Sequence, residues 1–255
     1  MKVTILGSGT YVPELNKCTA SYLIQTEKNN LLFDFGRGCT NQLLKKGIQY
    51  YAIDTIFITH MHADHLVELG PFLHIAKSEP SGAEKRTKDL TIYGPKGIIE
   101  SVQHLEEAYG IAKRNPKHKV EVIELKPGQS IEGEDWEFTC YEAVHVPTMA
   151  CLSFRIESGG KAFAFSGDTE YCPGLRECCK DANLAILEAS LPAKETYKGH
   201  MSGKDAGMVA QQSGVKKLVL THIGPNDDEN ERKSEAETAF KGQIFLAEDL
   251  MDFEL

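Results

Sequence analysis

Three histidines and one aspartate stand within six positions of the chain, as His60, His62, Asp64 and His65. Neutral imidazole and carboxylate groups are the ligands that zinc and similar divalent ions take in proteins. Residues 54–59, directly before the cluster, are rich in Ile, Phe and Thr and predict a β-strand. Because active sites of α/β folds lie at the carboxyl ends of strands, we expect a metal centre here and not a surface cluster of histidines.

Three further ligand-type residues follow predicted strands later in the chain. Each comes directly after an apolar run, with Gly or Pro close by: His145, Asp168 and His222. Alone, each of them would be assigned a structural role. Together with the first cluster they supply seven ligands, enough for two metal ions that share Asp168 as a bridge.

The overall composition is that of an ordinary globular protein. The chain has 255 residues, of which 41% are hydrophobic and 25% charged, so it can bury a substantial core. Its net charge of -9 argues against a general nucleic-acid binder, because phosphate affinity depends on a concentrated basic surface. Local basic clusters stand at 85–88 and 113–119, where solvated loops are the simpler interpretation.

The seven cysteines are an odd number without C-x-x-C spacing, which argues against a disulfide framework and against a zinc knuckle. We expect free thiols, most of them in the core, as suits a reducing cytosol. The apolar run at 1–7 is too short for a signal peptide, and no stretch approaches the roughly 18 apolar residues that span a bilayer. The expectation is a cytoplasmic protein with no membrane partner.

Short strands and helices alternate along the chain, and they define which segments must position the ligands. Strands are predicted at 3–6, 20–25, 31–35, 54–59, 90–93, 119–126, 136–145, 150–157, 161–166, 184–187, 217–221 and 243–246. Helices are predicted at 39–46, after His65, from Pro95 to about 109, at 203–213 and at 229–241. The polar, turn-rich residues 79–89 predict an exposed loop. Two halves, each a sheet with covering helices, are the natural packing for this order.

The series H-x-H-x-D-H, a lone His, an Asp and a final His resembles the motif series of the metallo-β-lactamase superfamily. The resemblance runs from the Gly7-x-Gly9 turn to the last predicted strand, so it covers nearly the whole chain. It implies an α/β (α+β) protein with a four-layer αββα sandwich, formed by residues 1–255 as a single domain. It also implies that Asp34 supports the site without binding metal.

The same resemblance divides the seven ligands between two ions. The first ion is assigned His60, His62 and His145, the second Asp64, His65 and His222, with Asp168 between them. Two divalent ions roughly 3.5 to 4 Å apart lower the pKa of a bridging water toward neutrality, which makes hydroxide available. This chemistry fits hydrolysis of a phosphodiester, a thioester, a lactone or an amide. Zn²⁺ suits the mixed nitrogen and oxygen ligands, and Mn²⁺ or Fe²⁺ would also be held.

Motifs around the cleft resemble the ribonuclease Z-like phosphodiesterases of this superfamily. They are Tyr93-Gly-Pro-Lys-Gly97, Ser166-Gly-Asp-Thr169, Leu187-Glu-Ala-Ser190 and His200-Met-Ser202. The resemblance implies a catalytic set of Asp64, Glu188 and His200. His200 would protonate or stabilise the leaving oxygen, because an imidazole titrates near neutral pH. Glu188 could orient it or raise its pKa. The simpler alternatives are an exposed loop residue for His200 and a structural role for Glu188.

One departure from that branch concerns the substrate. Ribonucleases Z that mature tRNA carry a long arm between the positions matching His145 and Asp168, whereas only 22 residues separate them here. The sequence therefore favours a small phosphodiester or an RNA 3′ end as substrate over a whole tRNA precursor. Homodimers are common among ribonuclease Z relatives, so a homodimer is an expectation from resemblance alone.

Two other functions remain open at this point. A thioester or lactone hydrolase of the glyoxalase II kind is disfavoured by the short, acidic residues 245–255, where that branch has a basic helical region. A catalytically silent protein that binds metal and a ligand is disfavoured because degenerate members lose ligands, and none is missing here.

Overall fold

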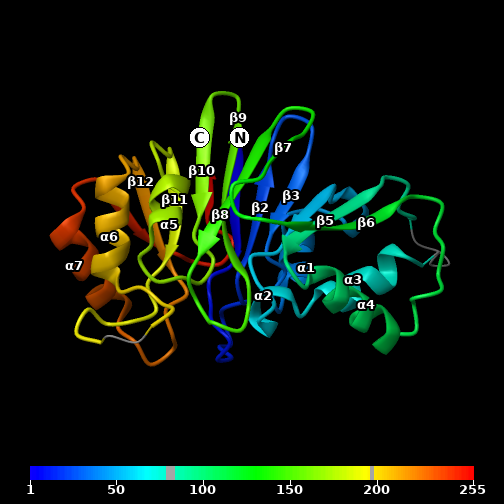
Figure 1. Cartoon of the computed structure of the whole chain (residues 1–255), viewed down its shortest axis with the longest axis horizontal. Helices are drawn as coiled ribbons and strands as arrows, with labels where there is room; N and C mark the ends of the chain where they lie inside the picture. The colour runs from blue at the N-terminus through cyan, green and yellow to red at the C-terminus, as the bar shows by residue number, and fades with distance from the viewer. Residues whose placement is uncertain (79–83, 196–197) are drawn as a thin grey trace.

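Two β-sheets packed face to face form the centre of the molecule, and helices cover the outer face of each sheet (Figure 1). The computed structural model describes residues 1–78, 84–195 and 198–255. This arrangement confirms the predicted αββα sandwich, with two halves that each contain a sheet and its covering helices.

The first sheet has seven strands among the described residues, in the spatial order β14-β1-β2-β3-β4-β5-β6. They are β1 (Lys2–Gly7), β2 (Ser21–Gln25), β3 (Asn30–Phe33), β4 (Thr55–Phe57), β5 (Leu90–Pro95), β6 (Val120–Leu125) and β14 (Asp252–Glu254). Strands β3 to β6 are parallel to one another. Because parallel strands end at the same edge of a sheet, the segments after β3, β4, β5 and β6 lie along one edge.

The second sheet repeats this plan in the order β13-β12-β11-β10-β9-β8-β7. Its strands are β7 (Ser130–Glu132), β8 (Glu137–Ala143), β9 (Cys151–Ser158), β10 (Lys161–Phe165), β11 (Leu184–Glu188), β12 (Lys217–Thr221) and β13 (Gln243–Leu246). Strands β10 to β13 are parallel, and β8 runs in the same direction because β9 is antiparallel to both β8 and β10. The loops after β8, β10, β11 and β12 therefore leave from one edge.

Aromatic side chains fill the space between the two sheets. Phe33 of β3 lies at the centre of this cluster and is fully buried. Its ring centroid is 5.2 to 6.4 Å from the rings of Phe57, Phe138, Phe154, Phe163 and Phe165. Together with Phe33 these rings come from five strands of both sheets, so the aromatic cluster fixes how the sheets are stacked.

The helices bury apolar residues against the outer faces of the sheets. On the first sheet these helices are α1 (Cys39–Lys45), α2 (Ala63–Leu66), α3 (Leu69–Ala76) and α4 (Ile98–Ala108). On the second sheet they are α5 (Pro173–Cys178), α6 (Gly203–Gln212) and α7 (Glu229–Ala239). None of the helices in the described part of the chain is both long enough and apolar enough to cross a bilayer.

The start of α4 differs from the prediction. Pro95 was expected to open this helix, but Pro95 is the last residue of β5 and pairs with Leu125 of β6. The turn into the helix requires a left-handed backbone at Gly97, whose φ is 100°. Since glycine adopts that conformation without a steric penalty, Gly97 and not Pro95 determines where the helix begins.

The predicted exposed loop at 79–89 is correct only in part. Residues 79–83 lie outside the described residues, and the rest of the segment is exposed except for Arg86. Arg86 is 5% exposed, and its guanidinium donates hydrogen bonds to the carbonyl oxygens of Tyr50, Ile53 and Asp89. A buried cation with several acceptors is a structural anchor, so the basic cluster at 85–88 is not a continuous charged surface.

Four short elements were not predicted from the sequence. These are β7, β14, α5 and the single 3₁₀ turn at Tyr50–Ala52. In addition, α2 begins at Ala63, inside the histidine motif and not after it. The cysteine prediction is confirmed, because all seven are free thiols and six of them are buried.

Phe33→Ala should destabilise the protein by about 3 to 5 kcal/mol, because it leaves a cavity between the two sheets. The control Phe33→Leu, which keeps most of the buried volume, should lose clearly less. Denaturant unfolding of both variants in the presence of a chelator measures the difference without a contribution from bound metal. A loss below about 1 kcal/mol for Phe33→Ala would contradict the central position of this ring.

Candidate metal centre

The seven predicted ligands lie together where the strand ends of the two sheets meet. His60 and His62 follow β4, and Asp64 and His65 lie in the short helix α2. The remaining three come from the second sheet, each after a strand with the same direction: His145 after β8, Asp168 after β10 and His222 after β12. Residues up to 162 positions apart in the sequence (His60 to His222) thus line one site.

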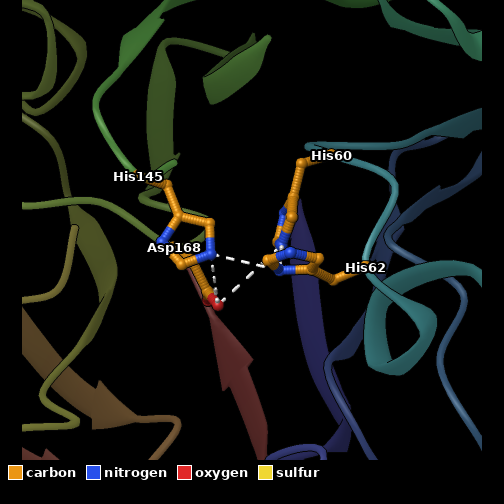
Figure 2. Close-up of side chains that lie close together, drawn as sticks. All are labelled: His60, His62, His145 and Asp168. Atoms are coloured by element: carbon orange, nitrogen blue, oxygen red, sulfur yellow. Dashed lines mark hydrogen bonds and ion pairs between the residues drawn. The ribbon is translucent and has the colours of Figure 1, made fainter. Parts of the chain in front are cut away.

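The first group of ligands is formed by His60, His62, His145 and Asp168, drawn in Figure 2. His62 Nδ1 lies 3.0 Å from His60 Nε2 and 3.1 Å from His145 Nε2. One ligand atom from each residue lies within 4.8 Å of the others. Three imidazole nitrogens that converge in this way can bind one divalent ion.

The second group is formed by Asp64, His65 and His222. Asp64 Oδ2 lies 3.2 Å from His222 Nε2 and 3.5 Å from His65 Nε2. All three side chains are at most 8% exposed. This is a second buried set of nitrogen and oxygen donors beside the first.

The carboxylate of Asp168 lies between the two groups. Its Oδ2 is 3.9 Å from the Nε2 atoms of both His60 and His145. Its Oδ1 is 3.4 Å from His65 Nε2 and 3.6 Å from His222 Nε2. Each oxygen therefore faces one group, as a carboxylate that bridges two cations would.

Hydrogen bonds on the outer side orient four of the five imidazole rings. Each of these rings uses Nδ1 for the outer contact and turns Nε2 toward the centre: His60 to Thr59 Oγ1 (3.1 Å), His65 to Asp34 Oδ2 (2.7 Å), His145 to the Gly199 carbonyl (2.8 Å) and His222 to Ser190 Oγ (3.0 Å). A carboxylate or carbonyl that accepts from Nδ1 leaves Nε2 unprotonated, which is the tautomer that binds metal.

The Nε2 atom of His65 tests whether these residues fit a metal ion. It is buried and has no hydrogen-bond partner among the described residues. Leaving such an atom unsatisfied costs about 1 to 3 kcal/mol. A divalent ion between His65, Asp64 and Asp168 would supply the missing partner, so the residues fit a pair of divalent ions.

The electrostatics of the site suit cation binding. Burial lowers the pKa of His60 and His62, so both imidazoles are neutral donors. Burial acts in the same direction on His65 and His222, but nearby carboxylates together outweigh it and raise the pKa of both rings, Asp168 and Asp34 for His65 and Asp168 and Asp64 for His222. Burial of Asp168 would raise its pKa, yet His222 and His65 hold it well below its usual value. Since these two rings must lose their protons when a cation binds, metal affinity should rise with pH.

Two residues of the site have a left-handed backbone that is rare outside glycine. Both Asp34 and His222 have a φ of 58°. Such conformations cost on the order of 1 to 3 kcal/mol each and persist only where the surroundings enforce them. Asp34 is enforced by Thr59, whose backbone N–H donates to Asp34 Oδ1 over 2.7 Å. The strain is thus located at one predicted ligand, His222, and at the carboxylate that orients another, His65.

His200 and Glu188 form a pair at the rim of the metal centre. His200 Nδ1 lies 2.9 Å from Oε1 of Glu188, and the carboxylate is 1% exposed. Glu188 is itself oriented by Thr169 N and Ser190 Oγ, at 2.8 and 2.7 Å. Burial would lower the pKa of His200, but Glu188 outweighs it and raises the pKa to about 9. His200 is therefore protonated at neutral pH, and its ring is 4.6 Å from that of His145.

Sequence reasoning assigned no orienting role to three residues that hold the ligands in place: Thr59, Ser190 and Gly199. For Gly199 a signal was present, because it directly precedes His200. Its φ is 92°, and a Cβ atom there would lie 2.2 Å from the carbonyl oxygen of His145. Only glycine allows this loop to approach His145 so closely.

A cavity of about 470 Å³ opens over the ligands. Ligand atoms of both groups and His200 line one part of it. Tyr11, Val12, Leu191 and Pro225 are among the residues that line the rest, together with Lys198. The cavity has the size of a small-molecule site and combines an apolar wall with an anionic and imidazole-rich floor.

Comparison with known proteins agrees with this geometry. Residues 29–223 match the family model described as "Beta-lactamase superfamily domain". The chain is 30% identical over 249 residues to the probable metallo-hydrolase YhfI of Bacillus subtilis, covering 97% of each protein. The crystal structure of that protein superposes with a TM-score of 0.84 at 27% identity and covers 99% of each chain.

Ribonucleases Z are also among the similar proteins. The ribonuclease Z of Methanosarcina acetivorans is 26% identical over 310 residues, covering 100% of this chain and 98% of that protein. The crystal structure of the short form of human tRNase Z superposes with a TM-score of 0.78 at 25% identity, covering 100% of this chain and 99% of that chain.

Asp34→Asn should reduce zinc affinity by about 10- to 100-fold. The new amide nitrogen cannot accept a hydrogen bond, so His65 would carry its proton on Nε2, the atom that faces the metal. Asparagine tolerates the left-handed backbone, which keeps the fold intact. Zinc content after dialysis against a competing chelator measures the effect. Asp54→Asn, which replaces a carboxylate bonded to Asn30 N and Lys88 far from the ligands, is the matched control. Equal zinc content in both variants would contradict the role of Asp34.

Proposed function

The chain belongs to the β-lactamase superfamily and is a metal-dependent hydrolase, and we propose that the bond it hydrolyses is a phosphodiester. The observation that carries this proposal is the pair of His200 and Glu188 beside Asp168. A protonated imidazole next to a bridging carboxylate is suited to a reaction in which a poor, alkoxide leaving group needs a proton. The naming of similar proteins as ribonuclease Z supports the same bond type.

In this proposal the seven ligands keep the roles described for the two groups. His60, His62 and His145 would hold one ion and Asp64, His65 and His222 the other, and Asp168 would serve both groups. When bound, two divalent ions lower the pKa of water toward neutrality and neutralise charge on the phosphate oxygens. Zn²⁺ is the proposed native metal because nitrogen and oxygen donors are mixed.

In the proposed reaction the side chains of the protein donate and accept the protons. A bond forms between the oxygen of water and phosphorus, and the bond from phosphorus to the leaving oxygen breaks. His200 gives its proton to that leaving oxygen, and Glu188 holds the imidazole in place through Nδ1. Asp64, whose carboxylate lines the same cavity, accepts the proton that water loses. The products are an alcohol and a phosphomonoester.

The proposed substrate is a small phosphodiester or an RNA 3′ end. Strands β9 and β10 occupy the interval between His145 and Asp168, which leaves no segment for a separate RNA-binding arm. The alignment with the archaeal ribonuclease Z extends over 310 positions against 255 residues here, in keeping with a shorter chain. We further propose that residues 1–255 act as one domain in the cytoplasm, where seven free thiols persist, and that the chain forms a homodimer as resemblance suggests.

Chelator-treated protein should be inactive toward bis(p-nitrophenyl) phosphate and should regain activity with about two equivalents of zinc per chain. Release of p-nitrophenolate measures the rate. A thioester and a lactone are assayed in parallel under the same metal loading. Hydrolysis of the thioester or lactone without any hydrolysis of the phosphodiester would overturn the proposed bond type.

His200→Ala should leave the zinc content unchanged and lower kcat by roughly 10²- to 10⁴-fold on a dinucleotide. The loss should be smaller on bis(p-nitrophenyl) phosphate, because p-nitrophenolate leaves without a proton. His74→Ala, on the exposed side of α3, is the matched control and should retain wild-type rates. An equal loss on both substrates would remove His200 from the role of proton donor.

A further inference from the structure

A second cavity of about 630 Å³ adjoins the cavity over the metal centre. The two share His145, Val146 and Lys198, so the second cavity continues from the first on the far side of a metal-facing histidine. Its walls come from the ends of β5, β6 and β8 and from the loop before β9. It is therefore formed by both sheets, at the same edge as the candidate metal centre.

Three lysines from distant parts of the chain line this second cavity. Lys96 follows β5 and Lys126 follows β6, and the preceding residues, Pro95 and Leu125, are paired in register. The two lysines therefore stand next to each other at the sheet edge. Lys198 lies on the wall shared with the first cavity. All three are exposed, and none of their ammonium groups forms an ion pair or hydrogen bond within the described residues.

The carboxylates of the second cavity do not neutralise these lysines. Glu142 and Glu170 also line it. Glu170 Oε2 accepts a hydrogen bond from the backbone N–H of Gly199 over 3.2 Å, which fixes the loop that carries Lys198. Three cations face two carboxylates here, on a chain whose net charge is -9. An unpaired cluster of cations on an acidic protein attracts anionic ligands.

We propose that the second cavity is a subsite for a further phosphate group of the substrate, held by Lys96, Lys126 and Lys198. This inference rests on the proposed phosphodiesterase function and narrows its substrate class to molecules with at least one phosphate beyond the scissile one. The apolar residues Leu125, Val144 and Met149 in the same cavity suit the sugar or base that links two phosphates. Substrates with one phosphate would occupy the first cavity alone.

The test compares a substrate with one phosphate and substrates with several. Bis(p-nitrophenyl) phosphate has one phosphate, a thymidine tetranucleotide has phosphates linked through sugars, and dithymidine tetraphosphate has phosphates linked directly. The variant is Lys96→Ala with Lys126→Ala, and the matched control is Lys113→Ala with Lys117→Ala, which removes two exposed lysines outside both cavities. Lys198 is left intact because it lies two residues from His200.

The wild-type protein should prefer the tetranucleotide or the tetraphosphate over bis(p-nitrophenyl) phosphate in kcat/KM. The Lys96/Lys126 double variant should reduce that preference by about 2- to 30-fold, since it removes two exposed ion pairs and each contributes about 0.2 to 1 kcal/mol. In this variant the slope of log kcat/KM against log salt concentration should also become shallower by about 1.4, which is about 0.7 for each of the two lost phosphate contacts. The control variant should keep the wild-type preference and slope. The drop in kcat/KM caused by the double substitution is then compared for the tetranucleotide and the tetraphosphate. The larger drop shows whether the subsite binds phosphates linked through sugars or phosphates linked directly.

A preference and salt slope that remain at wild-type values in the Lys96/Lys126 variant would overturn the subsite while leaving the phosphodiesterase proposal intact. If zinc-loaded protein hydrolyses no phosphodiester at all, the proposed function fails separately. In that case fluorescence anisotropy with a labelled thymidine tetranucleotide still decides on the subsite. Weaker binding by the Lys96/Lys126 variant than by the control supports it, and equal binding overturns it.

Discussion

The arrangement of the site depends on the contacts between the carboxylate of Asp168 and four imidazole rings. One of its oxygens faces the imidazoles of His60 and His145, and the other faces those of His65 and His222. Three of these four rings come from different strand ends, so the two sheets must be stacked in one relative position for the contact to form. The aromatic cluster around Phe33, with rings from both sheets, provides that position.

Many of the residues around the site form hydrogen bonds that orient its imidazole rings. An imidazole without an outer partner could present either nitrogen to the centre, and only one is useful for binding a cation. Asp34, Gly199 and Ser190 remove that freedom for His65, His145 and His222. Glu188 does the same for His200, and its other oxygen holds Ser190, so one buried carboxylate supports both the proposed proton donor and a metal-facing ring.

Much of the site could be predicted because its residues follow strands, and strand ends are visible as apolar runs. The seven ligands are predicted in this way, and the family resemblance supplies their grouping. The pair of Glu188 and His200 is predicted from the resemblance of its motifs to the ribonuclease Z-like branch. The orienting roles of Thr59 and Ser190 were missed, because they depend on contacts with residues distant in the sequence, Asp34 for Thr59 and His222 for Ser190.

The errors in the fold have a similar origin. The start of α4 was placed at Pro95 because a proline is common at the first turn, whereas the left-handed backbone at Gly97 decides where the helix begins. The polar neighbours of Arg86 predict an exposed loop, yet its buried guanidinium donates to the carbonyl groups of Tyr50 and Ile53, which lie outside that loop, and of Asp89 within it. For Arg86, and for Pro95 through its pairing with Leu125 of β6, a contact between distant segments outweighs the local pattern. The second, lysine-lined cavity also arises only when β5 and β6 pair, so no local motif marks it.

The most direct test of the account is anomalous diffraction at the zinc absorption edge from crystals of zinc-loaded protein. Two peaks about 3.5 to 4 Å apart, one on each side of the Asp168 carboxylate, are the expected result. The central claim is that the two sheets jointly hold a pair of metal ions. A single peak would contradict it, and so would two peaks of which neither lies beside His145 or neither lies beside His222.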